Sequence, residues 1–346
     1  MKKLAQFLFC LSVLSLLLTG CGDKKASTSG EGEKKVYKIA MVSDTIGTEQ
    51  FILQAYNALV ASSEKNGFEY VSLECSDTAM YLEKAQAAAE DGYDLIVGVG
   101  WAAAEPFSEL ADQYPDTRFA VIDTTATNEK VTSIGYNEAE GAYILGVMVA
   151  TAFPNDDLFG YVSSYQTYAT YKYRWGFEQG VLSVNPNAKF MYNFTDSYSD
   201  TAKAYEFAMQ QHAAGANFIM GGVAASANAG IYQAALEEAE KGTPFYTSGL
   251  SVDQTTADNP YLAFGLLKNT GNTMNYIVDN FLAGTLEGGP QILGVKEGGF
   301  GVYHITTESM NFVNTDIVTD EVIAAGKAAE AQIKSGELVL IAPSEE

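Results

Sequence analysis

Short apolar runs alternate with longer amphipathic segments along most of this chain, from about residue 36 to residue 335. The short runs are typical of buried strands. The longer segments, with apolar residues three or four positions apart, are typical of helices. The first half of the pattern predicts strands at 37–43, 70–75, 94–100, 118–123 and 132–136, separated by helices at 49–66, 80–91, 103–114 and 138–153. Strands that alternate with helices favour an α/β fold with a parallel sheet.

A second series of strands and helices repeats this order. It predicts strands at 158–163, 189–195, 218–222, 245–248 and 261–267, helices at 169–185, 200–214, 227–241 and 270–284, a strand at 301–304 and a helix at 320–335. The two blocks predict two doubly wound parallel-sheet lobes, an N-terminal lobe of 36–136 with about 268–298 and a C-terminal lobe of 137–267 with about 299–346. Doubly wound sheets bind ligands outside the carboxyl ends of their strands, so two facing lobes would hold a ligand between them.

The first twenty residues differ from the rest, because two lysines precede a mostly apolar run over 4–18. Such a run is short for a membrane span and fits a secretory signal peptide, with an uncleaved membrane anchor as the alternative. The residues LTGC at 18–21 resemble the lipobox of bacterial lipoproteins. We therefore expect a signal peptide over 1–20, a lipid on Cys21 and a flexible tether over 21–35. The protein would be anchored on the extracytoplasmic face of the cell membrane.

Composition excludes several classes of partner and site. Of 346 residues, 43 are acidic and 20 basic, which gives a net charge of −23 at pH 7. No basic cluster follows Lys35, so DNA and RNA are not expected partners. Two histidines and three cysteines leave little material for a metal site or a disulfide framework. With Cys21 carrying lipid, Cys75 has no intramolecular partner, and we expect a fold without metal, cofactor or disulfide.

Residues 98–103, GVGWAA, have the form G-x-G-x-x-A of dinucleotide-binding sites. The motif follows the third predicted strand instead of the first, and Trp101 would place bulk where a pyrophosphate must approach the backbone. A tight strand-to-helix turn explains the same residues, which leaves an NAD-dependent enzyme as a weak alternative. His212 and His304 lack partners at metal-ligand spacing and are expected to be structural, and neither a G-x-S-x-G nor a Walker A motif occurs. The chain is not expected to be an enzyme.

The ends of the predicted strands offer binding chemistry instead. Asp44 and Asp123 each close a strand, where a carboxylate can accept hydrogen bonds from the vicinal hydroxyls of a ribose or another sugar. The alternative for both is to cap the following helix. Phe51 and Trp101 could present flat faces to a ring, with core packing as the alternative. Lys268 ends an apolar strand and could donate to an oxygen-rich ligand, or it could be an ordinary solvated lysine.

Six sequence blocks resemble successive blocks of the basic membrane protein family. They are YDLIVGVG at 93–100, YPDTRFAVID at 114–123, YNEAEGAYILGVMVA at 136–150, GLSVDQ at 249–254, LLKN at 266–269 and KEGGFG at 296–301. Members of this family are lipoprotein substrate-binding components of ABC importers, and the best-understood members bind purine nucleosides. The resemblance, which extends from about Val36 to Val302, implies a type I periplasmic-binding-protein fold with a multi-strand hinge. It also implies a nucleoside ligand, a permease–ATPase complex as partner, and a monomer.

The resemblance also implies roles for individual residues. Asp44 and Phe51 match an acid that contacts the nucleoside and an aromatic residue that stacks on its base. Asp123 matches the ribose-binding acid after the fourth strand, and Lys268 matches a lysine that reaches the ribose oxygens. Trp101 is expected to stack with Phe51 because it follows a predicted strand, and the resemblance assigns it no role.

Other positions depart from the family pattern. Gln50 and Ile52 replace a serine and an asparagine of the first block, which removes one polar contact. In the block that addresses the base, Ser251 stands where the family usually has an aspartate, while Asp253 is retained, so the preferred base stays open. No second stacking aromatic can be located near 218–224, where this chain offers only Phe218 and Met220, so the second base-stacking residue stays open.

The leading hypothesis is a receptor that closes two lobes around a nucleoside, preferably a purine nucleoside, and delivers it to an ABC permease. Two alternatives remain within the class of binding proteins. The ligand could be a sugar or another polyol, or the protein could be a surface lipoprotein that senses a small molecule for a membrane receptor.

Overall fold

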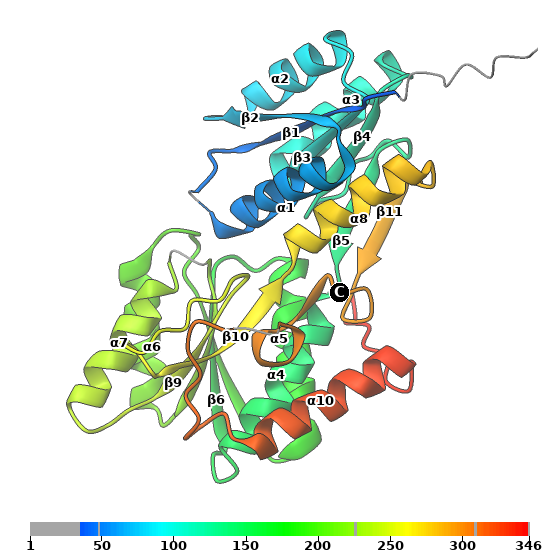
Figure 1. Cartoon of the computed structure of the whole chain (residues 1–346). Coiled ribbons are helices and arrows are strands. Elements are labelled where there is room, and N and C mark those ends of the chain that lie inside the picture. The colour runs from blue at the N-terminus through cyan, green and yellow to red at the C-terminus, as the bar shows by residue number, and fades with distance from the viewer. Residues whose placement is uncertain (1–34, 48, 225–226, 308–309, 345–346) are drawn as a thin grey trace, which may run out of the picture. The chain divides into compact units, whose positions relative to one another are not determined.

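The computed structural model describes residues 35–344 apart from 48, 225–226 and 308–309. The predicted signal peptide, Cys21 and nearly all of the predicted tether therefore lie outside the described residues. From Val36 onward the chain forms one unit that contains two six-stranded sheets and their helices (Figure 1). None of the helices in this described part has the length and apolarity needed to cross a membrane.

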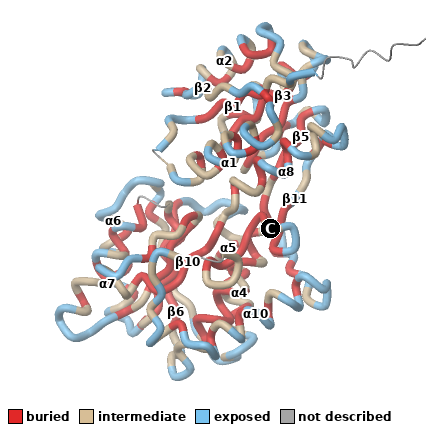
Figure 2. The backbone as a smooth tube through the Cα atoms, in the orientation of Figure 1, coloured by how far each residue is buried: buried red, intermediate tan, exposed pale blue. Residues whose placement is uncertain are grey.

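The first sheet is parallel throughout. Its strands, from one edge to the other, are β11 (Gly289–Leu293), β5 (Thr132–Tyr136), β4 (Arg118–Ile122), β3 (Leu95–Val99), β1 (Lys38–Asp44) and β2 (Glu69–Cys75). Helices α1 (Gln50–Asn66) and α8 (Thr270–Ala283) pack with Ile39 and Met41 on one face, and α2 (Ala79–Glu90) and α3 (Ala104–Gln113) pack with Ala40 and Val42 on the other. Because both faces are covered, the central strands are continuous apolar runs and are buried (Figure 2).

The second sheet has the same strand order. Its strands are β12 (Phe300–Val302), β10 (Leu262–Lys268), β9 (Tyr246–Gly249), β8 (Phe218–Gly222), β6 (Leu158–Ser163) and β7 (Lys189–Phe194), of which only β12 is antiparallel to its neighbour. Helices α6 (Thr201–Ala213) and α7 (Ala229–Glu240) cover one face, and α4 (Glu138–Ala152), α5 (Tyr168–Val184) and α10 (Asp320–Ser335) cover the other.

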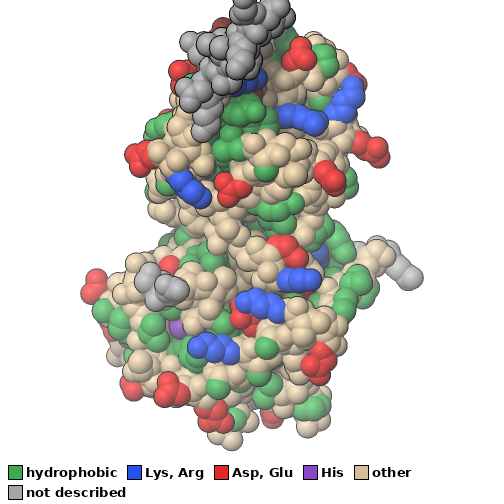
Figure 3. All heavy atoms as spheres, turned by 45° about the vertical axis from the view of Figure 1, so that its right-hand side comes forward, with side chains coloured by type: hydrophobic (Ala, Val, Ile, Leu, Met, Phe, Trp, Pro, Cys, Tyr) green, Lys and Arg blue, Asp and Glu red, His purple; other side chains and the backbone are tan. Residues whose placement is uncertain are grey.

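Within the described residues the chain passes between the two sheets at three places. These are the steps from β5 to α4, from β10 to α8 and from β11 to β12. In the space-filling view the surface narrows where the two lobes meet (Figure 3). The crossings place the ends of β5 and β10 at this junction, next to the edge where ligand-binding residues are expected.

The predicted elements agree with the structure within one or two residues, apart from one strand that is partly wrong, and one observed strand was not predicted. The predicted strand 301–304 is wrong in its second half, because β12 ends at Val302 and residues Tyr303–Thr306 form the short helix α9. Strand β11 was not predicted, since its sequence GPQIL begins like a turn. Pro290 is compatible with β11 because this strand lies at the edge of the sheet, where one side needs no hydrogen bonds.

Candidate functional site

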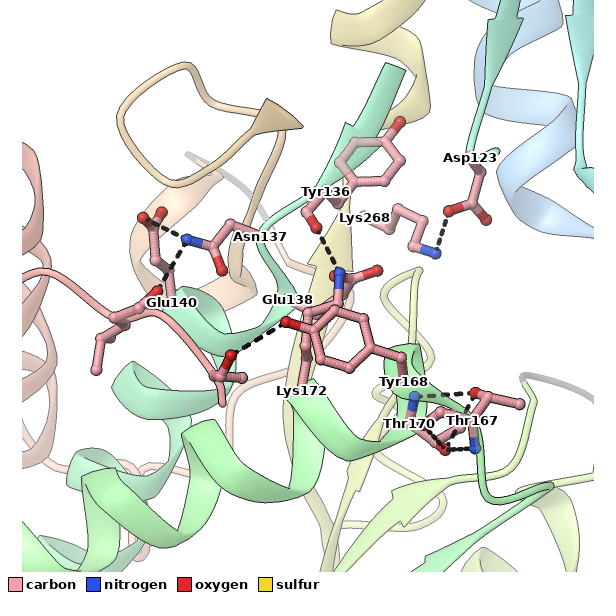
Figure 4. A network of polar contacts seen from close by, with 12 residues as sticks. Asp123, Tyr136, Asn137, Glu138, Glu140, Thr167, Tyr168, Thr170, Lys172 and Lys268 are labelled. Carbon is pink, nitrogen blue, oxygen red and sulfur yellow. Dashed lines mark hydrogen bonds and ion pairs between the residues drawn. The ribbon is translucent and has the colours of Figure 1, made fainter. Parts of the chain in front are cut away.

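One ion pair joins the carboxyl ends of a strand from each sheet. The Lys268 Nζ at the end of β10 lies 2.7 Å from Oδ1 of Asp123, which directly follows β4 (Figure 4). The carboxyl edges of the two sheets therefore meet at this pair. Both residues are among those predicted from the sequence to bind a ligand, and the structure brings them together.

Lys268 remains charged in a sheltered position. Only 12% of its side chain is exposed, and its ammonium lies 5.3 Å from the centroid of the Tyr136 ring. Burial by itself would lower the pKa of Lys268. The negative charge of Asp123, together with Tyr173 and Glu138, outweighs burial and raises the pKa well above its usual value. The side chain is a permanent hydrogen-bond donor, and the solvated-lysine alternative is wrong.

Left-handed backbone occurs at the same edge of the sheets. Among the described non-glycine residues it is found at Asp123, Asp196 and Ser251, with φ of 67°, 54° and 70°. Each follows the end of a strand by one or two residues: β4, β7 and β9. Such backbone is uncommon outside glycine and clusters at functional sites. Asp196 was not predicted, because an aspartate after a strand has no distinguishing sequence signal.

Asp44 and Phe51 lie at either end of the connection from β1 to α1. Asp44 is exposed, and its Oδ1 accepts the backbone N–H of Thr45 at 2.7 Å. It does not cap α1, because the N-cap position is Glu49, and no helix follows Asp123 directly, so the capping alternative is wrong for both aspartates. Phe51 is half-buried against the core, and its carbonyl accepts the Thr270 hydroxyl at the start of α8. Its stacking role stays a prediction.

Trp101 lies two residues after the end of β3, at the carboxyl edge of the first sheet. The residue is 74% exposed and begins a single helical turn, so core packing is not its role. The packing and backbone conformation of the chain explain both glycines of the G-x-G-x-x-A motif. A Cβ on Gly98 would lie 2.3 Å from the Cβ of Ala103, and Gly100 has φ of 97°. The motif is therefore explained as a tight turn that lets the following helix pack closely on β3.

The segment after β9 carries the two residues predicted to address a base. The Ser251 carbonyl accepts the backbone N–H of Lys268 at 3.2 Å, which ties this segment to β10. The Asp253 carboxylate accepts the N–H and hydroxyl of Thr255 at 2.9 and 2.6 Å and the N–H of Asn311 at 2.7 Å. A ligand would have to share Asp253 with these three donors. Contact of either residue with a ligand stays a prediction.

Sequence reasoning missed the polar cluster around Tyr136. Its ring lies beside the Lys268 ammonium, and its carbonyl accepts Lys172 Nζ at 3.0 Å (Figure 4). Its hydroxyl contacts Oγ1 of Thr273 at 2.8 Å. Lys172 also pairs with Glu138, which is only 4% exposed. The cluster fixes the first crossing between the sheets. The only sequence feature that could have indicated this cluster is that Tyr136 ends a predicted strand. Lys172 cannot be told from other lysines on predicted helices.

His212 lies in α6 and His304 in α9, and Cys75 ends β2 opposite Asp44. The ring of His212 packs 4.9 Å from that of Phe245, and neither ring nitrogen of His304 has a hydrogen-bond partner among the described residues. Burial lowers the pKa of His304 to about 4, although Asp253 opposes the shift. Within the described ranges there is no group of His, Cys, Asp and Glu that could hold a metal ion, and Cys75 is buried and unpaired by a disulfide.

Comparison with known proteins identifies the family. The family model for Bmp, described as ABC transporter substrate-binding protein PnrA-like, matches residues 36–338. The chain belongs to the Bmp family. It is therefore an ABC transporter substrate-binding protein, and the family predicted from the sequence blocks is confirmed.

Relatives of this Bmp protein agree with that assignment. A Lactococcus lactis subsp. cremoris protein named ABC transporter nucleoside-binding protein BmpA is 24% identical over 355 residues, which cover 94% of this chain and 100% of the relative. The CD4+ T-cell-stimulating antigen of Listeria monocytogenes is 28% identical over 269 residues, or 73% of this chain and 74% of that protein.

Solved structures confirm the fold class. An ABC transporter solute-binding protein from Aeropyrum pernix K1 has a TM-score of 0.71 at 22% sequence identity and covers 89% of this chain and 94% of its own. One from Conexibacter woesei has a TM-score of 0.69 at 22% identity, covering 89% and 99%. The Bmp chain thus has the type I periplasmic-binding-protein fold, with two parallel-sheet α/β lobes.

Proposed function

We propose that this protein is a lipid-anchored receptor that binds a nucleoside, preferably a purine nucleoside, between its lobes and delivers it unaltered to an ABC permease and ATPase. The family assignment supplies the class, a substrate-binding protein of an ABC transporter. The nucleoside, the anchor and the absence of catalysis are the proposal.

The Asp123–Lys268 pair is the observation that carries it. It sets a carboxylate acceptor and an ammonium donor 2.7 Å apart where the two lobes meet. Vicinal ribose hydroxyls can donate to such a carboxylate and accept from such an ammonium, and charge-assisted hydrogen bonds of this kind are strong. The exposed Trp101, which follows the neighbouring strand β3, offers a flat face for a base. The name of the Lactococcus relative, a nucleoside-binding protein, supports the same ligand.

The proposed anchor rests on the lipobox-like residues at 18–21, with Cys21 as the acylated residue. Relatives from Pyrococcus abyssi and Pyrococcus horikoshii are named lipoproteins. Metabolic labelling with a fatty acid tests the proposal. Label should be incorporated by the natural chain and lost in Cys21→Ala, while Cys75→Ala should keep it, and labelling of Cys21→Ala would contradict it.

Calorimetric titration of ligand-free protein tests the nucleoside. We expect binding of inosine, guanosine or adenosine, weaker binding of pyrimidine nucleosides, and no consumption of the ligand. If no nucleoside produces either a heat of binding or a thermal shift, the proposal is overturned.

A sugar or another polyol is the second candidate. Ile52 replaces a polar residue of the family pattern and is only 2% exposed in the core, so this position offers no hydrogen bond to a base. Glucose, arabinose and ribose belong in the same titration. Tight binding of a free sugar, with no response to nucleosides, would favour this candidate.

A further inference from the structure

The two sheets share a strand order that marks one particular point in each. Read from β2, the first sheet runs β2-β1-β3-β4, and read from β7, the second runs β7-β6-β8-β9. In the first sheet β2 lies on one side of β1 and β3 on the other, and in the second sheet β7 and β8 flank β6 in the same way. Sheets of this order bind ligands outside the carboxyl ends of the strands at this switch point. In the first sheet the point lies between β1 and β3, where Asp44 and Trp101 follow the strands.

The second sheet has its switch point between β6 and β8, and Ser164 and Tyr165 follow β6 there. Ser164 is 1% exposed, and its hydroxyl has no hydrogen-bond partner among the described residues. Buried hydroxyls are nearly always hydrogen-bonded. A ligand atom is one partner that the hydroxyl could take at this position.

Tyr165 combines exposure with a fixed backbone. It is 39% exposed, and its carbonyl accepts the Thr170 hydroxyl at 2.6 Å. Thr170 belongs to the capping box that begins α5 with Thr167 (Figure 4). The ring also contacts Tyr198, which follows β7, edge-on at a centroid distance of 5.0 Å. Tyr198 is itself 57% exposed, so two large aromatic side chains are exposed together at this edge.

We infer that Ser164 and Tyr165 form the second lobe's half of the ligand site, with the Tyr165 ring stacking on the base of the nucleoside and the Ser164 hydroxyl bonding one of its polar atoms. This inference rests on the proposed function. It also names a second base-stacking residue, which the sequence left open after a search near 218–224. Phe218 and Met220 are fully buried in the core and cannot stack on a ligand.

The test measures nucleoside affinity in a set of tyrosine variants. Tyr165→Ala should weaken the binding of the purine nucleoside that the natural protein binds best by about tenfold or more, the scale of base–aromatic stacking. Tyr165→Phe keeps the ring and should bind within about threefold of the natural protein. Tyr276→Ala is the matched control, because Tyr276 is 36% exposed on α8 and bonds Gln291. Its affinity should not change.

Two readouts separate this inference from the proposed function. If the natural protein binds a nucleoside and Tyr165→Ala binds it equally well, the inference is overturned while the proposed function stands. If the natural protein binds no nucleoside, both fall. Ser164→Ala should leave the thermal unfolding midpoint unchanged or raised, because it removes a buried unpaired hydroxyl, and should still weaken binding. A gain in stability with unchanged affinity would exclude Ser164 from the site.

Discussion

The Asp123 carboxylate and the Lys268 ammonium lie 2.7 Å apart although 145 positions separate the two residues in the sequence. Each follows or ends a strand of a different sheet, so the pair joins the lobes at the edge where a ligand is expected. A ligand that binds there must form hydrogen bonds with a carboxylate and an ammonium whose opposite charges already neutralise one another. Such a site favours a neutral, hydroxylated ligand over a charged one, because an added charge would be sheltered from water without a partner.

Breaking this pair should affect both stability and binding. Lys268→Met removes the ammonium and leaves the partly buried Asp123 carboxylate without its partner. We expect the free energy of unfolding to fall by about 1–3 kcal/mol and nucleoside affinity to fall about tenfold or more. Denaturant unfolding and calorimetry measure the two effects. Lys130→Met is the control, since both side chains of the Lys130–Asp112 pair are more than half exposed, and equal losses in both variants would contradict the prediction.

Trp101→Ala should separate binding from folding. Because Trp101 is 74% exposed, its removal should change the free energy of unfolding by less than about 0.5 kcal/mol. Loss of a stacked ring should weaken nucleoside binding by about 1–3 kcal/mol. Ile341→Ala, at a position 75% exposed, should alter neither quantity. Unchanged affinity in Trp101→Ala would remove Trp101 from the site.

Helices α4 and α5 approach one another so closely that glycine is required between them. A Cβ on Gly180 would lie 2.1 Å from the carbonyl oxygen of Tyr143, so Gly180→Ala must push the helices apart. We expect a loss of about 1–3 kcal/mol in the free energy of unfolding. Gly271→Ala in α8 is the milder comparison, because there the nearest atom would be 3.3 Å away and has to shift by only a few tenths of an ångström. A Gly180→Ala protein as stable as Gly271→Ala would show that the helix contact tolerates a methyl group.

Acidification should destabilise the fold through His304. Its pKa is about 4 in the folded protein, below the 6.5 of an exposed histidine, because burial opposes the charged form. Between pH 6.5 and 4 the unfolded chain therefore binds a proton at His304 that the folded chain does not bind. The free energy of unfolding falls as the pH falls, by about 3 kcal/mol over this range. Denaturant unfolding at several pH values, compared between the natural protein and His304→Met, isolates this effect from the many carboxylates. Parallel pH curves for the two proteins would contradict it.

The sequence predicted the elements whose own residues carry a clear pattern and missed those that depend on tertiary contacts. Runs such as 95–99 and 158–163 are buried between helix layers, so an apolar run alone defines them. Strand β11 instead exists because it pairs with β5, and its own residues begin with Gly and Pro. Residues 303–306 turn into α9 because β12 ends after pairing with only three residues of β10.

The same division applies to the candidate site. Asp123 and Lys268 could be predicted because each stands out at the end of an apolar run. Tyr165 could not, since several tyrosines surround it in the sequence and only the sheet order places it at a switch point. Lys172 acquires its position only when α5 packs beside the end of β5.

The most direct test of the central claim is to identify what the protein carries when it is purified under native conditions. The protein should be denatured and the released small molecules analysed by mass spectrometry, with the double variant Asp123→Asn/Lys268→Met as the control. The account predicts an intact purine nucleoside from the natural protein and none from the variant. Release of a free sugar, or of equal amounts of nucleoside from both proteins, would contradict it.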